Sequence, residues 1–366
     1  MSIQITQQQG EALAAVEKWL DTDKQVFKLF GVAGAGKTTI AKFVEDMVDS
    51  YAYAAYTGKA AHVLMQKGCT PASTIHSMIY RAHQDLYTGR WSFRLDNDSW
   101  IKGLDLVIVD EASMVGPEIG EDLLRLARKV LVIGDPFQLP PVKDQGFFTE
   151  GKPDYMLTEI HRQAAENPII MLSKLIREGG ILKYGTYGDS KILKAKQFDT
   201  AMLLEPDQIL VGKNDTRCYM NQQYRKAKGY EALSEYVPLA GERLICLRNN
   251  HERGFLNGQM YEVVSANHDR MDVEIQIIPW ESESTVIDKI STPMEYFQGK
   301  EHELDWNIRR SCDEFTYGAT ITTHKSQGSQ WPNVMIFDQS KVFREHAARW
   351  KYTSLTRASE KFTMFM

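Results

Sequence analysis

One stretch constrains the fold of this chain more than any other, namely Val26–Thr39, with the sequence VFKLFGVAGAGKTT. An apolar run ends at Gly31, and the residues that follow match the pattern GxxxxGK[ST] through Gly36, Lys37 and Thr38. Glycines let backbone N–H groups converge on phosphate oxygens at the start of the next helix. The lysine of this pattern reaches the β- and γ-phosphates, and the hydroxyl group ligates Mg²⁺. The stretch therefore predicts a nucleoside triphosphate site formed by Gly31, Gly34, Ala35, Gly36, Lys37, Thr38 and Thr39.

A chance match is the first alternative to consider, because the pattern arises by accident in roughly one or two chains per hundred of this length. The flanking sequence argues against it. A β-type run precedes the loop, and a helix-like run, residues 39–48, follows it. An ordinary glycine-rich turn between a strand and a helix therefore explains the stretch less well than a phosphate-binding loop does.

The bulk composition indicates a globular protein with room for two domains in 366 residues, 43% of them hydrophobic and 25% charged. No apolar run approaches the ~20 residues of a membrane span, and the first residues, MSIQITQQQGEAL, do not resemble a signal peptide. The four cysteines, Cys69, Cys218, Cys246 and Cys312, are far apart, which suits a reducing compartment. We expect a cytoplasmic protein without a membrane partner. The net charge of −5 neither indicates nor excludes nucleic acid.

Two further apolar runs end in polar residues that suit phosphoryl chemistry. The run from Leu104 is unbroken, as a buried parallel strand requires, and it ends at the adjacent carboxylates Asp110 and Glu111. One carboxylate can hold Mg²⁺ through water while the other polarises the attacking water. The run from Lys129 leads into Asp135 and a proline-rich turn, which places Gln138 to contact a γ-phosphate.

Several single residues are weaker candidates, each with a structural alternative. The amide of Gln9 suits an adenine edge, but a solvated helix start is equally consistent. Thr57 and Lys59 follow a predicted strand, where parallel sheets bind ligands. His76 is by default a packing or capping residue. Arg162 suits transition-state charge neutralisation, although an ordinary surface arginine is the better explanation of this residue taken alone.

Two β-rich segments interrupt the α/β pattern. Residues 81–99 place Tyr87, Trp91 and Phe93 around a Thr-Gly turn, which predicts an inserted hairpin whose aromatic side chains either serve a function or pack on one another. Strand-like alternation between about 242 and 278 predicts a small barrel-like insertion that extends to about residue 315. Residues 281–310 give no clear element. The α/β pattern resumes at Tyr317.

Eight motifs in order, spread over nearly the whole chain, carry a resemblance to a known family. They read GVAGAGKTT, YTGKAA, TIHS, VDEAS, GDPFQLPPV, LTEIHRQ, ITTHKSQGS and YTSLTRA. This series resembles the superfamily 1 DNA helicases, and among them the RecD-like and phage Dda-type enzymes. The QLPPV form is similar to the branch that moves 5′ to 3′.

The resemblance implies an α/β fold with two RecA-like motor domains, each a parallel sheet with one β insertion. The first would comprise residues 1–80 and 100–164, with the 81–99 hairpin as a strand-separating pin. The second would comprise residues 165–235 and 316–366, interrupted by the insertion 236–315. ATP and Mg²⁺ would be the ligands, bound where the two motor domains face each other.

The resemblance also implies a role for each site residue. Gln9 would contact adenine, Lys37 and Thr38 would hold phosphate and Mg²⁺, and Asp110 would support the metal. Glu111 would be the catalytic base, Gln138 the γ-phosphate sensor, and Arg162 and Arg357 arginine fingers. The expected DNA contacts are Thr57, Lys59, His76, Trp91, Phe93, Thr323, His324 and Lys325.

The implied activity is ATP-dependent translocation on single-stranded DNA and unwinding of duplex DNA, in replication, recombination or repair. The implied partners are single-stranded DNA, forked or tailed duplex DNA and a single-strand-binding protein, with the chain acting as a monomer. The alternatives are a superfamily 1 RNA helicase, a nucleic-acid-stimulated ATPase that remodels protein–DNA complexes, and a non-catalytic clamp.

Overall fold

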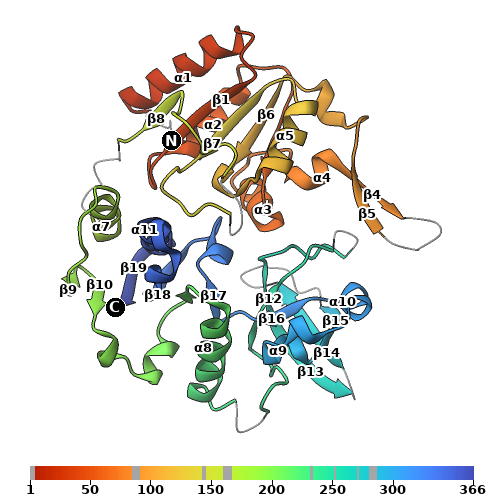
Figure 1. The fold of residues 1–366 in the computed structure, drawn as a ribbon, viewed down its shortest axis with the longest axis vertical. Helices are drawn as coiled ribbons and strands as arrows, with labels where there is room; N and C mark the ends of the chain where they lie inside the picture. Colours follow the sequence, from red (N-terminus) through yellow and green to blue (C-terminus); the bar gives the residue numbers. More distant parts are fainter. Residues whose placement is uncertain are drawn as a thin grey trace. The chain divides into compact units, whose positions relative to one another are not determined.

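The computed structural model describes residues 5–84, 91–141, 146–159, 167–230, 234–250, 253–269, 272–279 and 287–366. The chain divides into two compact units, Met1–Ile170 and Met171–Met366. Each has its own hydrophobic core, and each is described by itself (Figure 1).

Unit 1 is built on a parallel sheet with the strand order β3-β2-β6-β7-β1-β8 in the described residues. The strands are β1 (Val26–Gly31), β2 (Tyr51–Ala55), β3 (Ala72–Thr74), β6 (Leu106–Asp110), β7 (Val130–Gly134) and β8 (Tyr155–Leu157). The helices are α1 (Gln7–Leu20), α2 (Lys37–Glu45), α3 (Gly58–Gln66), α4 (Ile75–Ile79) and α5 (Pro117–Leu126). The unbroken apolar runs predicted as strands form β1, β6 and β7, because both faces of this sheet are buried.

A two-stranded antiparallel hairpin, β4 (Tyr80–Gln84) and β5 (Trp91–Leu95), extends from unit 1 (Figure 1). Tyr80 anchors its base by donating a hydrogen bond of 2.7 Å from its hydroxyl to Asp122 on α5. This hairpin lies in the segment where the sequence predicts one, although Tyr87 falls outside the described residues.

Unit 2 contains a second sheet with the strand order β17-β11-β18-β19-β10-β9 in the described residues. Its strands are β9 (Gly185–Tyr187), β10 (Ser190–Leu193), β11 (Gln208–Val211), β17 (Thr320–Thr322), β18 (Trp331–Phe337) and β19 (Ala358–Phe365). All pair in parallel except the edge strand β9. The helices that accompany it are α7 (Pro168–Arg177), α8 (Asn214–Ala227) and α11 (Ala347–Leu355). The first three residues of α7 precede the division between the units, which follows Ile170.

The β insertion of unit 2 is an antiparallel sheet with the order β15-β14-β13-β12-β16 in the described residues. The strands are β12 (Arg243–Cys246), β13 (Met260–Asp269), β14 (Asp272–Pro279), β15 (Asp288–Pro293) and β16 (Phe315–Tyr317), with short helices α9 (Glu295–Gln298) and α10 (Trp306–Ser311). Its two edges approach each other, since the amide of Asp313, just before β16, donates 2.9 Å to the Ser291 carbonyl on β15. The sheet is therefore barrel-like, and the predicted fold class is confirmed.

Three segments differ from the sequence-based expectations. Tyr317 ends strand β16 of the insertion, and the motor sheet resumes only at Thr320. Residues 281–310, which gave no clear element, include β15, α9 and α10. Residues 168–204 hold α7, β9 and β10, for which the sequence offered no prediction. These elements are short, so none of them produces a long periodic pattern.

A buried ion pair fastens the β insertion to helix α8. The guanidinium of Arg225 on α8 donates 2.8 and 3.1 Å hydrogen bonds to the two carboxylate oxygens of Glu242, which immediately precedes β12. The same guanidinium donates to the carbonyls of Glu235 at 2.5 Å and Val237 at 2.9 Å. It also lies 4.8 Å from the ring of Tyr317 on β16. The insertion and α8 are thus joined at both ends of the insertion.

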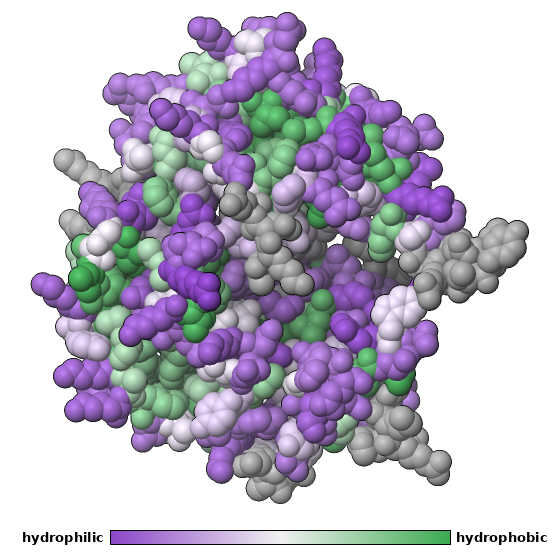
Figure 2. Space-filling view, viewed as in Figure 1, coloured by the Kyte–Doolittle hydropathy of each residue, from purple (hydrophilic) through white to green (hydrophobic). Residues whose placement is uncertain are grey.

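The surface carries no single dominant apolar area on the face shown in Figure 2, where hydrophobic residues occur in separate groups between hydrophilic ones. Among the described helices, none combines the length and the hydropathy needed to cross a membrane.

Candidate functional site

The phosphate-binding loop connects β1 to α2 at the carboxyl end of the unit 1 sheet. Gly36 precedes α2 with a φ of 76°, in the left-handed region that favours glycine. A Cβ atom at Gly36 would lie 2.5 Å from Nε2 of Gln9, and one at Gly31 would lie 2.9 Å from Cβ of Leu157. Close packing therefore favours glycine at both positions, and at Gly36 the backbone conformation favours it as well.

Lys37 holds the loop in shape from the first position of α2. Its ammonium donates hydrogen bonds to the carbonyl of Gly31 at 2.8 Å and to that of Val32 at 3.0 Å. These carbonyls are neutral acceptors, and hydrogen bonds from a cation to a phosphate are stronger. The lysine is thus poised at the loop with partners that an anionic ligand can replace. Thr38 and Thr39 follow it in the first turn of α2.

Gln9 packs directly against the loop, which excludes the solvated helix start as its role. Only 4% of the residue is exposed, and its Nε2 donates 3.1 Å to the carbonyl of Ala35. Its Oε1 accepts a 2.9 Å hydrogen bond from the amide of Thr6, which completes the capping box at the start of α1. The adenine contact expected of Gln9 remains a proposal.

Gln8 is a residue that the sequence did not single out. Its Oε1 accepts 2.8 Å hydrogen bonds from the amides of Thr158 and Glu159, and its Nε2 donates 3.1 Å to the hydroxyl of Thr158. Gln8 therefore fixes the backbone just beyond β8, in the LTEIHRQ motif that contains Arg162. Arg162 itself lies outside the described residues. Two adjacent glutamines offered no signal to distinguish this role from that of Gln9.

The acidic pair lies at the carboxyl end of β6, separated from β1 in the sheet by β7. Asp110 is the last residue of β6, and its Oδ1 accepts a 2.9 Å hydrogen bond from the amide of Glu111. Burial raises the pKa of Asp110, while that hydrogen bond and the positive charge of Lys37 oppose the rise. Glu111 has a φ of 52° and a ψ of 41°, a conformation costing a non-glycine residue about 1–2 kcal/mol. Such strain is typical of functional positions.

Gln138 follows β7, and its side-chain oxygen is unpaired within the described part of the chain. The backbone amide of Gln138 donates 3.1 Å to the Asp135 carbonyl, and the amide of Phe137 donates 3.0 Å to Oδ1 of Asp135, so the turn is fixed. Gln138 is 5% exposed, and its buried Oε1 has no hydrogen-bond partner among the described residues. An unpaired buried amide oxygen is costly, and it fits a ligand or water at this position.

These residues fit ATP and Mg²⁺. The loop provides backbone amides and Lys37 for phosphate, and the hydroxyl of Thr38 with the carboxylate of Asp110 provides the oxygen donors that Mg²⁺ prefers. A bound divalent cation would also reverse the effect of burial on Asp110, because it favours the ionised carboxylate.

The candidate DNA residues of unit 1 lie on α3, α4 and the hairpin. The hydroxyl of Thr57 accepts 3.2 Å from the amide of Ala60 and so caps α3, in whose first turn Lys59 lies. On α4, the ring of His76 lies 4.5 Å from that of Phe93 on β5 and 4.8 Å from that of Tyr80. Phe93 is 62% exposed, so its ring reaches solvent from a fixed position. The side chain of Trp91 is outside the described part of the chain.

In unit 2, Thr323 is an internal support. It is fully buried, with a 2.9 Å hydrogen bond between its hydroxyl and that of Ser354. The DNA contact expected of Thr323 remains a prediction. His324 is partly exposed and lies 5.5 Å from the ring of Phe343, and burial together with nearby His346 lowers its pKa. Lys325 is partly exposed as well.

Arg357 is buried within unit 2, with 4% of the residue exposed. Its guanidinium donates to the carbonyl of Thr353 at 3.1 Å, to that of Ser329 at 3.3 Å and to the hydroxyl of Thr356 at 3.3 Å. All three acceptors are neutral. None of these hydrogen bonds therefore goes to a carboxylate. Arg357 belongs to the motif YTSLTRA, which includes the end of α11.

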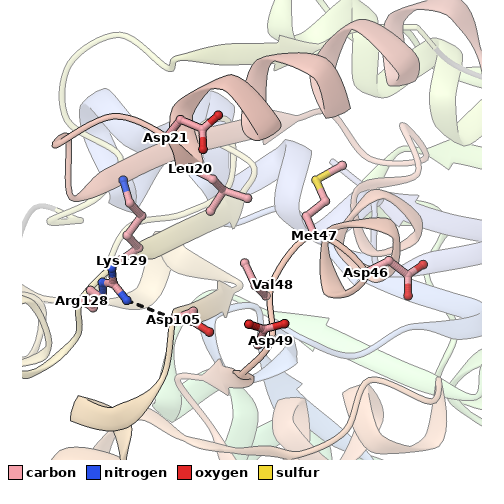
Figure 3. Close-up of a pocket in the computed structure, with 9 residues that line it drawn as sticks. All are labelled: Leu20, Asp21, Asp46, Met47, Val48, Asp49, Asp105, Arg128 and Lys129. Carbon is pink, nitrogen blue, oxygen red and sulfur yellow. Dashed lines mark hydrogen bonds and ion pairs between the residues drawn. The ribbon is translucent and has the colours of Figure 1, made fainter.

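A separate cavity of about 360 Å³ lies at the other edge of the unit 1 sheet. It is lined by Asp105 and Lys129, which precede β6 and β7, whereas the acidic pair and Gln138 follow those strands. Figure 3 shows the ion pair between Arg128 and Asp105, 3.1 Å long, that closes part of it. The ammonium of Lys129 donates to the carbonyls of Trp19, Thr22 and Lys24 at the end of α1. These contacts are structural, and the cavity is remote from the phosphate-binding loop.

Two family models match the chain. Residues 4–197 match the AAA domain, which is more than half of the chain, and residues 317–364 match the UvrD-like helicase C-terminal domain. The chain is 26% identical over 371 residues to the ATP-dependent RecD2 DNA helicase of Deinococcus radiodurans, covering 91% of this chain and 46% of the relative. It therefore spans less than half the length of that protein.

Two Pif1 helicases are also similar. The ATP-dependent DNA helicase Pif1 of Campylobacter jejuni is 24% identical over 319 residues, covering 72% of this chain and 69% of that protein. The crystal structure of a Bacteroides Pif1 helicase in complex with ADP-AlF3 and single-stranded DNA superposes with a TM-score of 0.56 at 16% identity, covering 99% and 92% of the two chains. At that identity the superposition shows the fold, with its two RecA-like domains. With both family matches and the eight ordered motifs, the chain belongs to the superfamily 1 helicases of the RecD and Pif1 type.

Proposed function

We propose that this chain is an ATP-driven motor that moves along single-stranded DNA from 5′ to 3′ and unwinds duplex DNA. One observation carries the proposal. Strands β1, β6 and β7 end at the same edge of one parallel sheet. They are followed there by the phosphate loop, the pair Asp110–Glu111 and Gln138, whose amide oxygen has no partner in the residues that the structure describes. This combination serves hydrolysis of a γ-phosphate, whereas a clamp without catalysis needs none of it.

Each residue has a defined task in that reaction. The ammonium of Lys37 exchanges its two carbonyl partners for phosphate oxygens, and the loop amides hold the same phosphates. Thr38 and Asp110 would hold Mg²⁺, and the bound ion would supply positive charge that neutralises the phosphates. Glu111 accepts the proton of the attacking water, and Gln138 orients that water through its free oxygen.

Arg357 and Arg162 supply positive charge as the reaction proceeds. Because the acceptors of the Arg357 guanidinium are all neutral, exchanging them for an anionic phosphate is favourable. Arginines of this kind contribute ~10³-fold or more to the rate of phosphoryl transfer. Arg357 belongs to unit 2 and the phosphate loop to unit 1, so hydrolysis would be coupled to movement of one unit against the other.

The DNA contacts would come from Thr57, Lys59, His76, His324 and Lys325, and the hairpin with Phe93 would separate the strands. Contacts to the phosphate backbone of DNA carry no information on base sequence, so the motor could move along DNA of any sequence. The similar Bacteroides Pif1 helicase was crystallised with ADP-AlF3 and single-stranded DNA, which supports the proposal of a nucleotide and a DNA strand as the two ligands. The motor would act as a monomer in the cytoplasm, on forked or tailed duplexes covered in part by a single-strand-binding protein.

Unwinding of labelled duplexes with a 5′ or a 3′ single-stranded tail tests this proposal. We expect ATP-dependent unwinding of the 5′-tailed DNA duplex only. Unwinding from the 3′ tail would overturn the polarity. Activity only with an RNA tail would make the chain an RNA helicase, and ATP turnover without any unwinding would make it a remodelling ATPase.

A further inference from the structure

Unit 2 contains a cavity of about 150 Å³ where helix α8 meets the β insertion. Its elements, α8, α9, α10 and the strands around them, are drawn in green and blue in the lower part of Figure 1. Its lining includes Tyr296 and five ionisable side chains that could carry charge: Arg217, Glu301, Arg309, Glu314 and Lys325. The volume is several times the roughly 30 Å³ that one water occupies in the liquid. The cavity therefore has room for a small polar group.

Arg217 on α8 is buried but poorly satisfied. Its side chain is 6% exposed, yet its hydrogen bonds to Asn214, Thr316 and the sulfur of Cys218 are all 3.4 Å long. Its carboxylate partner, Glu301, is 3.8 Å away, beyond hydrogen-bonding distance. A buried guanidinium with only such partners leaves much of its desolvation cost uncompensated.

Arg225, two turns later on the same helix, shows how a saturated buried arginine looks in this protein. It makes a two-pronged contact of 2.8 and 3.1 Å with Glu242 and further hydrogen bonds of 2.5 and 2.9 Å to carbonyls. Arg217 differs from it in every one of these distances. The difference indicates that Arg217 is placed for a partner other than the protein groups around it.

Lys325 adds a second cationic group to the same cavity. Its ammonium makes no hydrogen bond in the part of the chain that the structure describes, and burial followed by the charge of Arg217 lowers its pKa. Three cationic and two acidic side chains line the cavity, and one of the acids, Glu314, lies 2.9 Å from Arg248 and 4.0 Å from Arg309. Arg217 and Lys325 therefore face one further carboxylate, that of Glu301. The remaining charges leave an excess of positive charge, which suits an anion.

We propose that this cavity binds one phosphate group between Arg217 and Lys325, and that the carboxylate of Glu301 competes with it. The inference rests on the function proposed above, because it identifies the phosphate as one from the backbone of single-stranded DNA. Lys325 belongs to the motif expected on that strand, whereas Arg217, Glu301 and the cavity have no assigned role. Glu301 holds Arg217 weakly enough to be displaced by a group that accepts two-pronged hydrogen bonds.

Two substitutions should change DNA affinity in opposite directions. Arg217→Gln should weaken binding of a labelled oligothymidylate about tenfold or more and reduce the slope of log K against log salt by about 0.7, the value for one phosphate on a single strand. Glu301→Gln should tighten binding about two- to fivefold. With Arg217 already replaced, Glu301→Gln should have no further effect. Arg128→Gln is the charge-matched control, because it removes an exposed arginine of unit 1 that precedes β7 and lies outside the proposed DNA contacts. This variant should leave the salt slope unchanged.

A merely structural role for Arg217 predicts a different result. Both substitutions would then weaken binding together with a fall in the thermal unfolding temperature, and the salt slope would stay constant. That outcome would overturn the proposal. So would a Glu301→Gln variant that binds the oligothymidylate no more tightly than the unaltered chain does. The Glu301 variant decides the matter even if Arg217→Gln folds poorly.

Inorganic phosphate distinguishes the source of the ligand. At matched ionic strength, phosphate should raise the unfolding temperature more than chloride does in Lys37→Ala, whose phosphate loop is disabled, and this increment should be lost when Arg217→Gln is added. An Arg217-dependent increment without any change in the DNA salt slope would assign the cavity to free phosphate and overturn the DNA assignment. Absence of DNA binding by the unaltered chain would instead refute the proposed function, while the phosphate measurement would still test the cavity.

Discussion

The buried pair of Arg225 and Glu242 provides a quantitative test of how the β insertion is held. Their side chains are 1% and 2% exposed, and Glu242→Gln keeps the shape of the side chain while removing its charge. Oε2 of Glu242 also accepts 2.7 Å from the amide of Leu239, so the substitution disturbs one further contact. The guanidinium would remain buried with one amide oxygen and the carbonyls of Glu235 and Val237 as acceptors, and without a carboxylate charge. Breaking one side of such a pair costs about 3–5 kcal/mol.

Urea unfolding followed by fluorescence and circular dichroism measures this loss. With a slope of about 2–3 kcal/mol per molar urea, the transition of unit 2 should move down by about 1–2 M. Arg225→Met combined with Glu242→Leu should recover most of the loss, because apolar packing replaces a buried pair without leaving a charge. Arg128→Gln, which breaks an exposed pair, should cost less than about 1 kcal/mol. A loss below about 1 kcal/mol for Glu242→Gln would refute the reasoning.

Three other substitutions test separate parts of the account. Gly36→Ala should abolish ATP turnover, because the residue has a φ of 76° and the new Cβ would lie 2.5 Å from Nε2 of Gln9. Gly10→Ala on α1 should retain turnover, because no atom lies within 4 Å of the position of its Cβ. Equal activity of the two variants would contradict the loop geometry. Phe93→Ala should reduce unwinding of a forked duplex more than DNA-stimulated ATP turnover, and an equal loss of both would make the hairpin structural. Burial lowers the pKa of His324 below its ordinary 6.5, so the unfolded chain binds the proton more readily than the folded chain does. The free energy of unfolding of the unaltered chain should therefore fall as the pH drops below 6.5. His324→Asn should reduce this pH dependence. An unchanged dependence in urea titrations between about pH 5 and 7 would refute that assignment.

Periodicity predicted the motor sheets because their strands are long apolar runs that end in chemically distinctive residues. Leu106–Asp110 is buried on both faces and leads into the acidic pair, so strand and site were visible together. Short elements such as Ser190–Leu193 escaped prediction, since four residues carry little periodic signal and their burial depends on pairing with the distant strand β19.

The supporting residues of the sites depended on tertiary structure. Gln8 and Gln9 are adjacent and chemically identical, and only the folded chain assigns one to the segment after β8 and the other to the phosphate loop. Arg217 and Arg225 lie on a helix in which most residues are polar, so nothing in the pattern showed that both are buried or that their partners differ. Thr323 was predicted as a DNA contact, and only the folded chain shows that its side chain is buried against Ser354.

The central claim is that hydrolysis at the phosphate loop is coupled to single-stranded DNA. The most direct test is the steady-state rate of ATP turnover with and without oligothymidylate, for the unaltered chain and for Lys37→Ala. We predict turnover that single-stranded DNA stimulates at least about tenfold, and no turnover above background in Lys37→Ala, because the ammonium that holds the phosphates is gone. Turnover that is indifferent to DNA, or that persists in Lys37→Ala, would contradict the account.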